Sequence, residues 1–262
     1  DEGYQPGPAV ELLRIQPGPF RIDVAASSWQ PDAPTIHRLE AIHGLHNPLG
    51  LAHYDTYYWS VGERGSPQYN FLNAKYLIAD KGQPAADASF IPVFDDDPYV
   101  DVYLNTNAQP RIRLVYETIL ALNDDDAFAA VHAPDFDPSS QVVLQNADAL
   151  QTRAPGESTL HYSYYSTHRQ IVTAVTTAPA YLVFSEVWYP GWRAKLNGKP
   201  ISLLHANYAF RAVYLPAGDS TVELTFFTST WHYAALASLV TMLLLTAILA
   251  TSVWRKHSST CE

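Results

Sequence analysis

Residues 186–215 read EVWYPGWRAKLNGKPISLLHANYAFRAVYL, and this stretch carries the strongest fold signal in the chain. Asn197-Gly198 lies between two short runs with the composition of β-strands. A tight type I′ turn needs a positive φ at both central residues, which asparagine and glycine accept most readily. The stretch therefore predicts a β-hairpin with its turn at these two residues.

Further candidate strands lie on both sides of this hairpin, separated by turn residues. A second turn is expected at 216–219, which reads PAGD. Short strands spaced by turns in this way are typical of antiparallel sandwiches and jelly rolls. The sequence thus predicts an antiparallel β-sandwich or jelly-roll-like domain over residues 156–229. Its expected strands are 159–165, 170–176, 180–187, 193–196, 201–204, 209–215 and 221–227.

An apolar segment follows the last expected strand almost directly. It carries no charged side chain and has aromatic residues at both ends. As a helix it would span about 33 Å, enough for the core of a bilayer. The sequence predicts one transmembrane helix over 231–254 in contact with lipid, in preference to a buried core helix. Arg255 and Lys256 follow at once, so the positive-inside rule places the tail 255–262 in the cytoplasm and the preceding chain outside.

The first part of the chain, residues 1–155, mixes strand and helix signals. Proline and glycine interrupt it often, as in QPGP at 16–19, so short elements joined by ordered loops are expected. The protein is therefore predicted to be mainly β, with a mixed α+β N-terminal part, a sandwich and a C-terminal membrane helix. The N-terminal strands are expected at 20–24, 71–79 and 112–115, and the helices at 35–43, just before 122 and at 124–131.

Charge and cysteine content limit the classes of function. The chain has 16 Lys and Arg against 26 Asp and Glu, a net formal charge of −10, which argues against nucleic acid as a partner. Cys261 is the only cysteine, so no disulfide can form within the chain. The sequence begins Asp1-Glu2-Gly3, without a methionine or a signal peptide, which indicates a processed protein or a fragment of a longer one.

Several short motifs occur in the order found in one known family. The C-terminal motifs are YPGW at 189–192, NGK at 197–199, NYAFRAV at 207–213 and PAG at 216–218. Weaker matches precede them at 44–49 (GLHNPL), 72–77 (LNAKYL) and 102–111 (VYLNTNAQPR). In these motifs, over about residues 20–255, the chain resembles the C-terminal region of YfhO-like bacterial membrane proteins.

The resemblance implies a multispanning membrane protein of the GT-C glycosyltransferase type, which transfers sugars from polyprenyl-phosphate donors at the outer face of the membrane. In such proteins the catalytic acidic residues lie on early external loops between membrane helices. This chain departs from the pattern, because it contains a single expected membrane helix. The resemblance therefore implies an external domain without the catalytic residues.

One group of aromatic residues combines ring faces with planar polar groups. Sugars stack their C–H faces on aromatic rings, and their hydroxyl groups hydrogen-bond to planar polar side chains. The alternative is that these rings form the sandwich core and a Pro-Gly corner. The candidate glycan-binding residues are Trp188, Tyr189, Trp192, Arg193, Asn207 and Tyr208.

Two acidic runs and a histidine-rich segment are candidate metal sites. Asp95–Asp97 and Asp124–Asp126 could supply the oxygen ligands that Ca²⁺ prefers. Residues 43–55 (HGLHNPLGLAHYD) could bind Zn²⁺ or Cu²⁺. Neither spacing matches a standard ligand motif, so solvated loops or a helix N-terminus are preferred. Ca²⁺ is left open as the one possible cofactor, and no catalytic motif is identified.

Two functions from different classes follow. The first is an accessory, non-catalytic extracytoplasmic domain of a YfhO-like protein, which binds or orients a glycan or lipid-linked sugar during the assembly of cell-surface glycans. The second is a single-helix structural subunit of a larger membrane complex, with other membrane subunits as partners. An independent enzyme such as a glycoside hydrolase is the weakest alternative, because no pair of acidic residues stands out.

Overall fold

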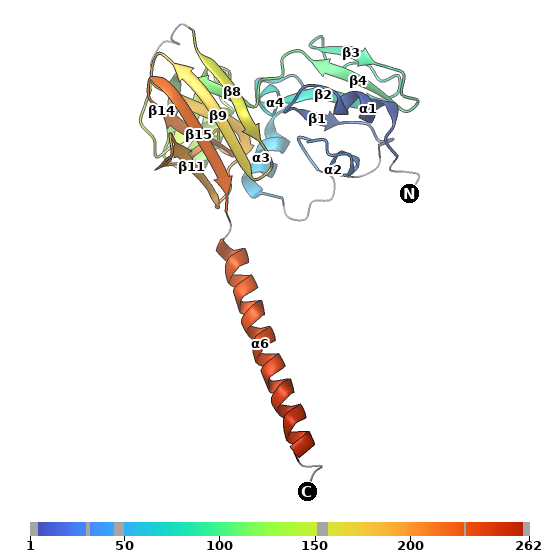
Figure 1. Cartoon of the computed structure of the whole chain (residues 1–262). Helices are drawn as coiled ribbons and strands as arrows, with labels where there is room; N and C mark the ends of the chain where they lie inside the picture. Colours follow the sequence, from blue (N-terminus) through green and yellow to red (C-terminus); the bar gives the residue numbers. More distant parts are fainter. Residues whose placement is uncertain (1–4, 30–31, 45–49, 151–156, 228, 259–262) are drawn as a thin grey trace.

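The computed structural model of the chain describes residues 5–29, 32–44, 50–150, 157–227 and 229–258. Two β-rich halves lie side by side, and one long helix, α6 (Ser229–Ser258), extends away from the sandwich half (Figure 1). The protein is mainly β, as predicted, with both mixed and antiparallel sheets.

The N-terminal half is a four-stranded sheet with short helices on it, in the order β1-β2-β4-β3. Pairing is antiparallel except between β1 and β2. Leu13 of α1 packs on Ile22 and Ile78 of the sheet. The buried carboxylate of Asp97 accepts a 3.1 Å hydrogen bond from the Ala9 backbone N–H and so caps the first turn of α1. The elements are α1 (Pro8–Arg14), β1 (Arg21–Val24), α2 (Ala33–Ile36), α3 (Ala52–Ser60), α4 (Pro67–Phe71), β2 (Ala74–Asp80), β3 (Phe90–Phe94) and β4 (Val100–Asn105).

The second half is a sandwich of a six-stranded sheet, β5-β10-β14-β13-β7-β6, and a five-stranded sheet, β12-β11-β15-β9-β8. Alternate residues of the strands face inward, such as Val172 and Ala174 of β9, and pack against Leu182 and Phe184 of the opposite sheet. The elements are β5 (Ile112–Val115), β6 (Glu117–Ala121), α5 (Asp124–Val131), β7 (Gln141–Gln145), β8 (Thr159–Tyr165), β9 (Arg169–Thr176), β10 (Ala180–Val187), β11 (Trp192–Leu196), β12 (Lys199–Ile201), β13 (Leu204–Ala206), β14 (Phe210–Leu215) and β15 (Gly218–Phe226).

The sandwich extends further toward the N-terminus than the predicted segment 156–229. Strands β5, β6 and β7 precede that segment and belong to the six-stranded sheet. The helix predicted just before residue 122 is in fact β6, which pairs in parallel with β7. Parallel neighbours need a crossover connection, and the correctly predicted helix α5 supplies it. A strand of five residues is too short to show a clear period in the sequence.

The two halves share one hydrophobic core. Phe71 and Leu77 of the N-terminal half belong to the same buried cluster as Val183 and Phe210 of the sandwich. The ring of Phe210 makes edge contacts with Phe71 and Tyr57 at centroid distances of 4.7 and 4.9 Å. The halves therefore pack as one body.

The predicted hairpin is present between β11 and β12. Asn197 and Gly198 both have positive φ, 49° and 81°, as a type I′ turn requires.

We expect Gly198→Val to lower the free energy of unfolding by about 1 kcal/mol or more, since a β-branched residue is strained at positive φ. Lys199→Val, at an exposed strand position, is the matched control and should change little. Equal melting temperatures for the two variants would contradict the expected strain.

Helix α6 has the length and composition of a membrane span. Its segment Tyr233–Thr251 has a mean hydropathy of 2.2, and none of it is buried inside the described structure. Large apolar side chains such as Leu244 and Leu249 are about 60% exposed. This agrees with the predicted single membrane helix, whereas the side of the membrane on which the rest of the chain lies stays a prediction.

Candidate functional site

An aromatic corner, residues 188–193, joins the two sheets of the sandwich. The chain leaves β10 in the six-stranded sheet and enters β11 in the five-stranded sheet. Gly191 has φ +119°, and a Cβ atom there would lie 3.0 Å from the carbonyl oxygen of Phe227, so only glycine fits. The backbone N–H of Phe227 donates a 2.8 Å hydrogen bond to the Gly191 carbonyl. The corner therefore rests on the end of β15, directly before α6.

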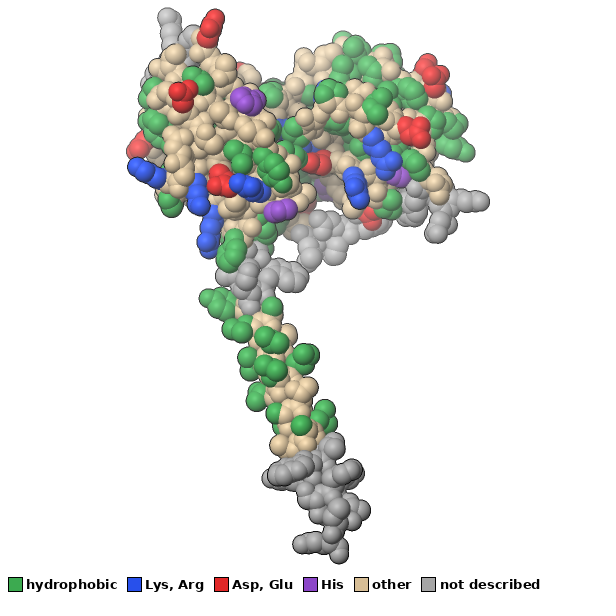
Figure 2. Space-filling view, in the orientation of Figure 1, with side chains coloured by type: hydrophobic (Ala, Val, Ile, Leu, Met, Phe, Trp, Pro, Cys, Tyr) green, Lys and Arg blue, Asp and Glu red, His purple; other side chains and the backbone are tan. Residues whose placement is uncertain are grey.

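Four of the six predicted glycan-binding residues line one hollow of about 420 Å³ at this corner: Trp188, Tyr189, Trp192 and Arg193. The Tyr189 residue is 43% exposed, and the Trp188 ring packs on His205 at 4.8 Å. Figure 2 shows several Lys and Arg side chains on the end of the sandwich from which α6 leaves. The hollow thus combines an accessible ring with cationic groups nearby.

The other two predicted residues lie outside the hollow. Asn207 is buried, and its side-chain oxygen accepts a 2.9 Å hydrogen bond from the Val143 backbone N–H. The Tyr208 ring packs on Phe128 and His53, at 5.1 and 4.9 Å. Both residues belong to the turn between β13 and β14, where they hold the turn against β7 and α5.

Trp192 is held in place by a buried cation. The guanidinium carbon of Arg211 lies 3.9 Å from the centroid of the Trp192 ring, a cation–π contact, and Phe226 packs at 5.4 Å. Arg211 is 1% exposed. Burial lowers the pKa of Arg211 to about 10, although Glu186 opposes that effect. Tyr189, rather than Trp192, is therefore the more accessible ring at the corner.

Behind the corner lies a group that we call the Glu186 cluster: Glu186, Arg21, Arg111 and Arg211. The Glu186 carboxylate accepts hydrogen bonds from Arg111 Nε at 2.9 Å and from Arg21 Nη2 at 3.2 Å. Arg211 Nη2 lies 3.9 Å away. Because Arg21 belongs to β1 and Glu186 to β10, the cluster ties the N-terminal half to the sandwich.

Electrostatics favour the ionised form of Glu186. Burial alone would raise the pKa of Glu186, but the charges of Arg21, Arg111 and Arg211 outweigh burial and lower the pKa to about 2. Glu40 also pairs with Arg111, at 2.8 Å, and accepts a hydrogen bond from the Tyr165 hydroxyl. The three guanidinium groups therefore depend on Glu186 as the only carboxylate that contacts all of them in the described part of the chain.

Sequence reasoning assigned no role to the three arginines of the Glu186 cluster. Two of them stand in motifs that carry the family resemblance, Arg111 in 102–111 and Arg211 in 207–213. The sequence feature that could have pointed to these arginines is an arginine inside an otherwise apolar strand, as in FRAVYL at 210–215. Such a residue is buried only when it is paired, so it predicts an acidic partner without identifying it.

Several of the candidate metal-binding residues have other partners in this structure. Asp97 caps α1, and Asp124 accepts hydrogen bonds from His53 and Gln145 at 2.9 and 2.8 Å. His46 lies outside the described residues, whereas His43 stacks on Tyr58. Across the described part of the chain, no group of three or more His, Cys, Asp or Glu side chains is placed to hold a metal ion. Ca²⁺ binding stays a prediction.

Comparison with known proteins gives one partial match. A Bacillus subtilis (strain 168) protein described as uncharacterized protein YfhO is 28% identical over 119 residues, which are 44% of this chain and 12% of that protein. The chain thus spans about an eighth of the length of the curated relative it matches. No family model and no solved structure matches the chain.

Proposed function

We propose that this chain is the extracytoplasmic, non-catalytic part of a YfhO-like membrane protein of the glycosyltransferase type, in which the aromatic corner binds or orients a glycan or a lipid-linked sugar. The hollow beside the start of α6 carries the proposal. The Gly191–Phe227 hydrogen bond places the corner next to the membrane helix. A sugar linked to a membrane lipid lies close to the membrane surface, which is where a membrane-spanning α6 would hold the corner. The partial similarity to YfhO supports the same class of protein.

Three residues of the hollow have a task in this proposal. Tyr189 offers a ring on which a sugar can stack, and its hydroxyl group can hydrogen-bond. Arg193 lies on the outer face, 4.7 Å from the Phe227 ring, and can donate to sugar hydroxyl or phosphate oxygens. Trp192, held by Arg211 and Phe226, forms the rigid floor.

We expect Tyr189→Ala to weaken glycan binding by about two- to tenfold, because an aromatic contact contributes about 0.5–1.5 kcal/mol beyond the buried area. The measurement is a titration of the full chain, in detergent or nanodiscs, with oligosaccharides while tryptophan fluorescence is followed. Tyr214→Ala is the control, since Tyr214 is 42% exposed at the far end of β14. Equal affinities for both variants would argue against the corner as the binding site.

Catalysis distinguishes the accessory function from an enzyme. We expect no transfer from a polyprenyl-linked sugar by this chain alone, because the resemblance places the catalytic acids on loops between membrane helices, and the described residues contain one candidate membrane helix. Turnover would refute the accessory function. The structural-subunit alternative would gain if no oligosaccharide bound while the chain copurified with other membrane subunits.

The proposed orientation is tested by proteolysis of intact cells. Arg255 and Lys256 follow the apolar segment of α6, so the sandwich is expected outside and the tail inside. Protease added to intact cells should then remove the folded region and leave the tail, as detected with an antibody against each part. Protection of the folded region until the cells are lysed would reverse the orientation.

A further inference from the structure

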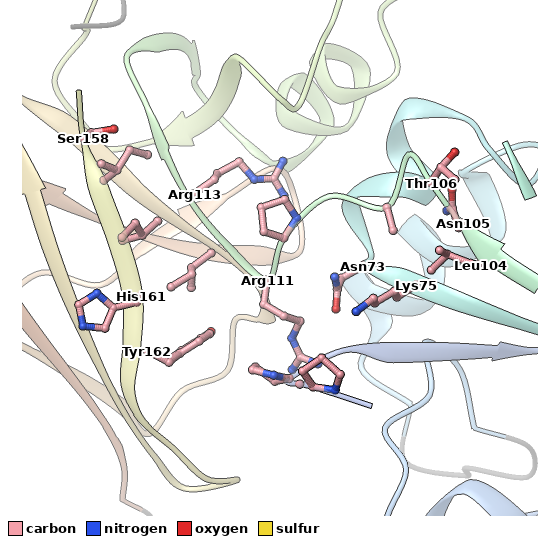
Figure 3. A pocket seen from close by; sticks show the side chains of 18 of the residues that line it. Asn73, Lys75, Leu104, Asn105, Thr106, Arg111, Arg113, Ser158, His161 and Tyr162 are labelled. Carbon is pink, nitrogen blue, oxygen red and sulfur yellow. The ribbon is translucent and has the colours of Figure 1, made fainter. Parts of the chain in front are cut away.

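A second, larger cavity lies between the two halves, away from the aromatic corner. Its volume is about 950 Å³, and its lining comes from the N-terminal half on one side and from β5 and β8 on the other (Figure 3). The lining includes Lys75, Arg111 and Arg113 but no Asp or Glu among the described residues. The chain has a net charge of −10, whereas the side chains that line this cavity include three basic groups and no carboxylate; Glu186 and Glu40, which pair with Arg111, lie outside the lining.

The N-terminal side of the cavity carries polar side chains among apolar ones, and its one cation is Lys75. Asn73 and Lys75 extend from β2 and the residue before it toward Arg111 (Figure 3). The Lys75 ammonium lies over the rings of Phe20 and Tyr76, at 5.6 and 5.5 Å. It forms no ion pair with any carboxylate that the structure describes.

Several buried polar atoms of the lining residues lack a hydrogen-bond partner within the described chain. They are Asn73 Oδ1, Arg111 Nη1, Tyr162 OH, and Nε and Nη2 of Arg113. Arg113 donates to the Pro138 carbonyl on the side away from β8, and burial lowers its pKa to about 9. A buried cation without a carboxylate partner is costly, and an anion nearby would offset that cost. Arg111 is different, because Glu186 and Glu40 pair with it.

The sandwich side of the cavity has an apolar part, beside the polar side chains of Arg113, Ser158 and His161. Ile112 and Leu114 of β5 face Leu160 and Tyr162 of β8, and Tyr116 also contributes to the lining. The apolar part can therefore cover an apolar body or the face of a ring, while Lys75, Arg111 and Arg113 supply positive charge. This division is the arrangement expected for a ligand with one charged end.

We propose that this cavity binds a small organic anion. Its phosphate or carboxylate group lies against the Lys75 ammonium beside Arg111, and its ring or apolar body lies against Leu114 and Leu160. Ammonium and guanidinium groups make strong charge-assisted hydrogen bonds with both kinds of anion. The site is separate from the aromatic corner and does not depend on the function proposed for it.

The test is calorimetric titration of the full chain in nanodiscs with four probes: inorganic phosphate, glucose 1-phosphate, glucuronate and uncharged glucose. We expect glucose 1-phosphate or glucuronate to bind more tightly than glucose, with an affinity that falls as salt rises. Inorganic phosphate shows whether the charged group alone suffices. Preference for glucose 1-phosphate over glucuronate identifies a phosphate ligand, and the reverse preference a carboxylate ligand.

Substitutions at and away from the cavity test whether the probes bind in it. Lys75→Gln, which keeps most of the side-chain stem, should weaken binding of the preferred anion by about tenfold or more, and Lys75→Arg should retain it. Lys199→Gln, at an exposed position of β12, is the control. The proposal is overturned if none of the charged probes binds, or if Lys75→Gln and Lys199→Gln bind them equally well.

Discussion

Replacing Glu186 with glutamine should lower the free energy of unfolding by about 3–5 kcal/mol. The substitution keeps the size of the side chain but removes the carboxylate that contacts Arg21, Arg111 and Arg211. Arg111 and Arg211 are 2% and 1% exposed, so water cannot replace the lost charge. Chemical denaturation followed by tryptophan fluorescence measures the effect, with Trp192 as a reporter next to Arg211.

Glu223→Gln is the matched control. Glu223 pairs with Arg169 at 2.8 Å, but both side chains reach solvent, with 28% and 47% exposed. Exposed ion pairs contribute about 0–1 kcal/mol, so this variant should unfold almost as the unchanged protein does. Similar losses from the two substitutions would show that the Glu186 cluster stabilises the fold no more than a surface pair does.

Lowering the pH should reduce the free energy of unfolding by about 3 kcal/mol through protonation of Glu186. The pKa of Glu186 is lowered from its ordinary value of 4.5 to about 2 in the folded chain, and each pKa unit corresponds to about 1.4 kcal/mol. The unfolded chain therefore takes up this proton more readily than the folded chain. The stabilisation is fully present above pH 4.5 and is lost as the pH falls toward 2.

The difference in unfolding free energy between the unchanged protein and Glu186→Gln isolates this effect from other acidic groups. Glutamine mimics a protonated glutamate, so the difference should be largest near neutral pH and shrink by about 3 kcal/mol at pH 2. Titration of the Glu186 carboxyl carbon by NMR in the unchanged protein gives the same pKa without any variant. A difference that is constant with pH, or a pKa near 4.5, would contradict the lowered pKa.

Local sequence determined most of the strands in the second half. The strands expected at 159–165 and 180–187 match β8 and β10 residue for residue. The turn at Asn197-Gly198 and the helix at 124–131 were also predictable, because φ preferences and helix-capping residues act within a few positions. The apolar segment of α6 was predictable as well, because its length and composition can be read directly from the sequence.

The candidate site was only partly predictable. Trp188, Tyr189, Trp192 and Arg193 are neighbours in the sequence, so one turn brings them to the same hollow. Asn207 lies in a different turn, and its side chain bonds to β7, a strand that the sequence did not show beside it. The sequence thus identified the part of the site that one continuous segment forms, and missed the part that depends on contacts between distant segments.

The sequence by itself determined most strands of the second half, the hairpin, the candidate membrane helix and the sandwich class. Only the tertiary structure decided that β5, β6 and β7 join the sandwich, that Arg21 reaches Glu186 across 165 positions, and that Lys75 and Leu160 line one cavity. The physical reason is that periodicity and propensity act over one or two turns of chain. Which strands become neighbours depends on how all the apolar faces are buried together, and ion pairs and cavities form only where that packing brings distant strands side by side.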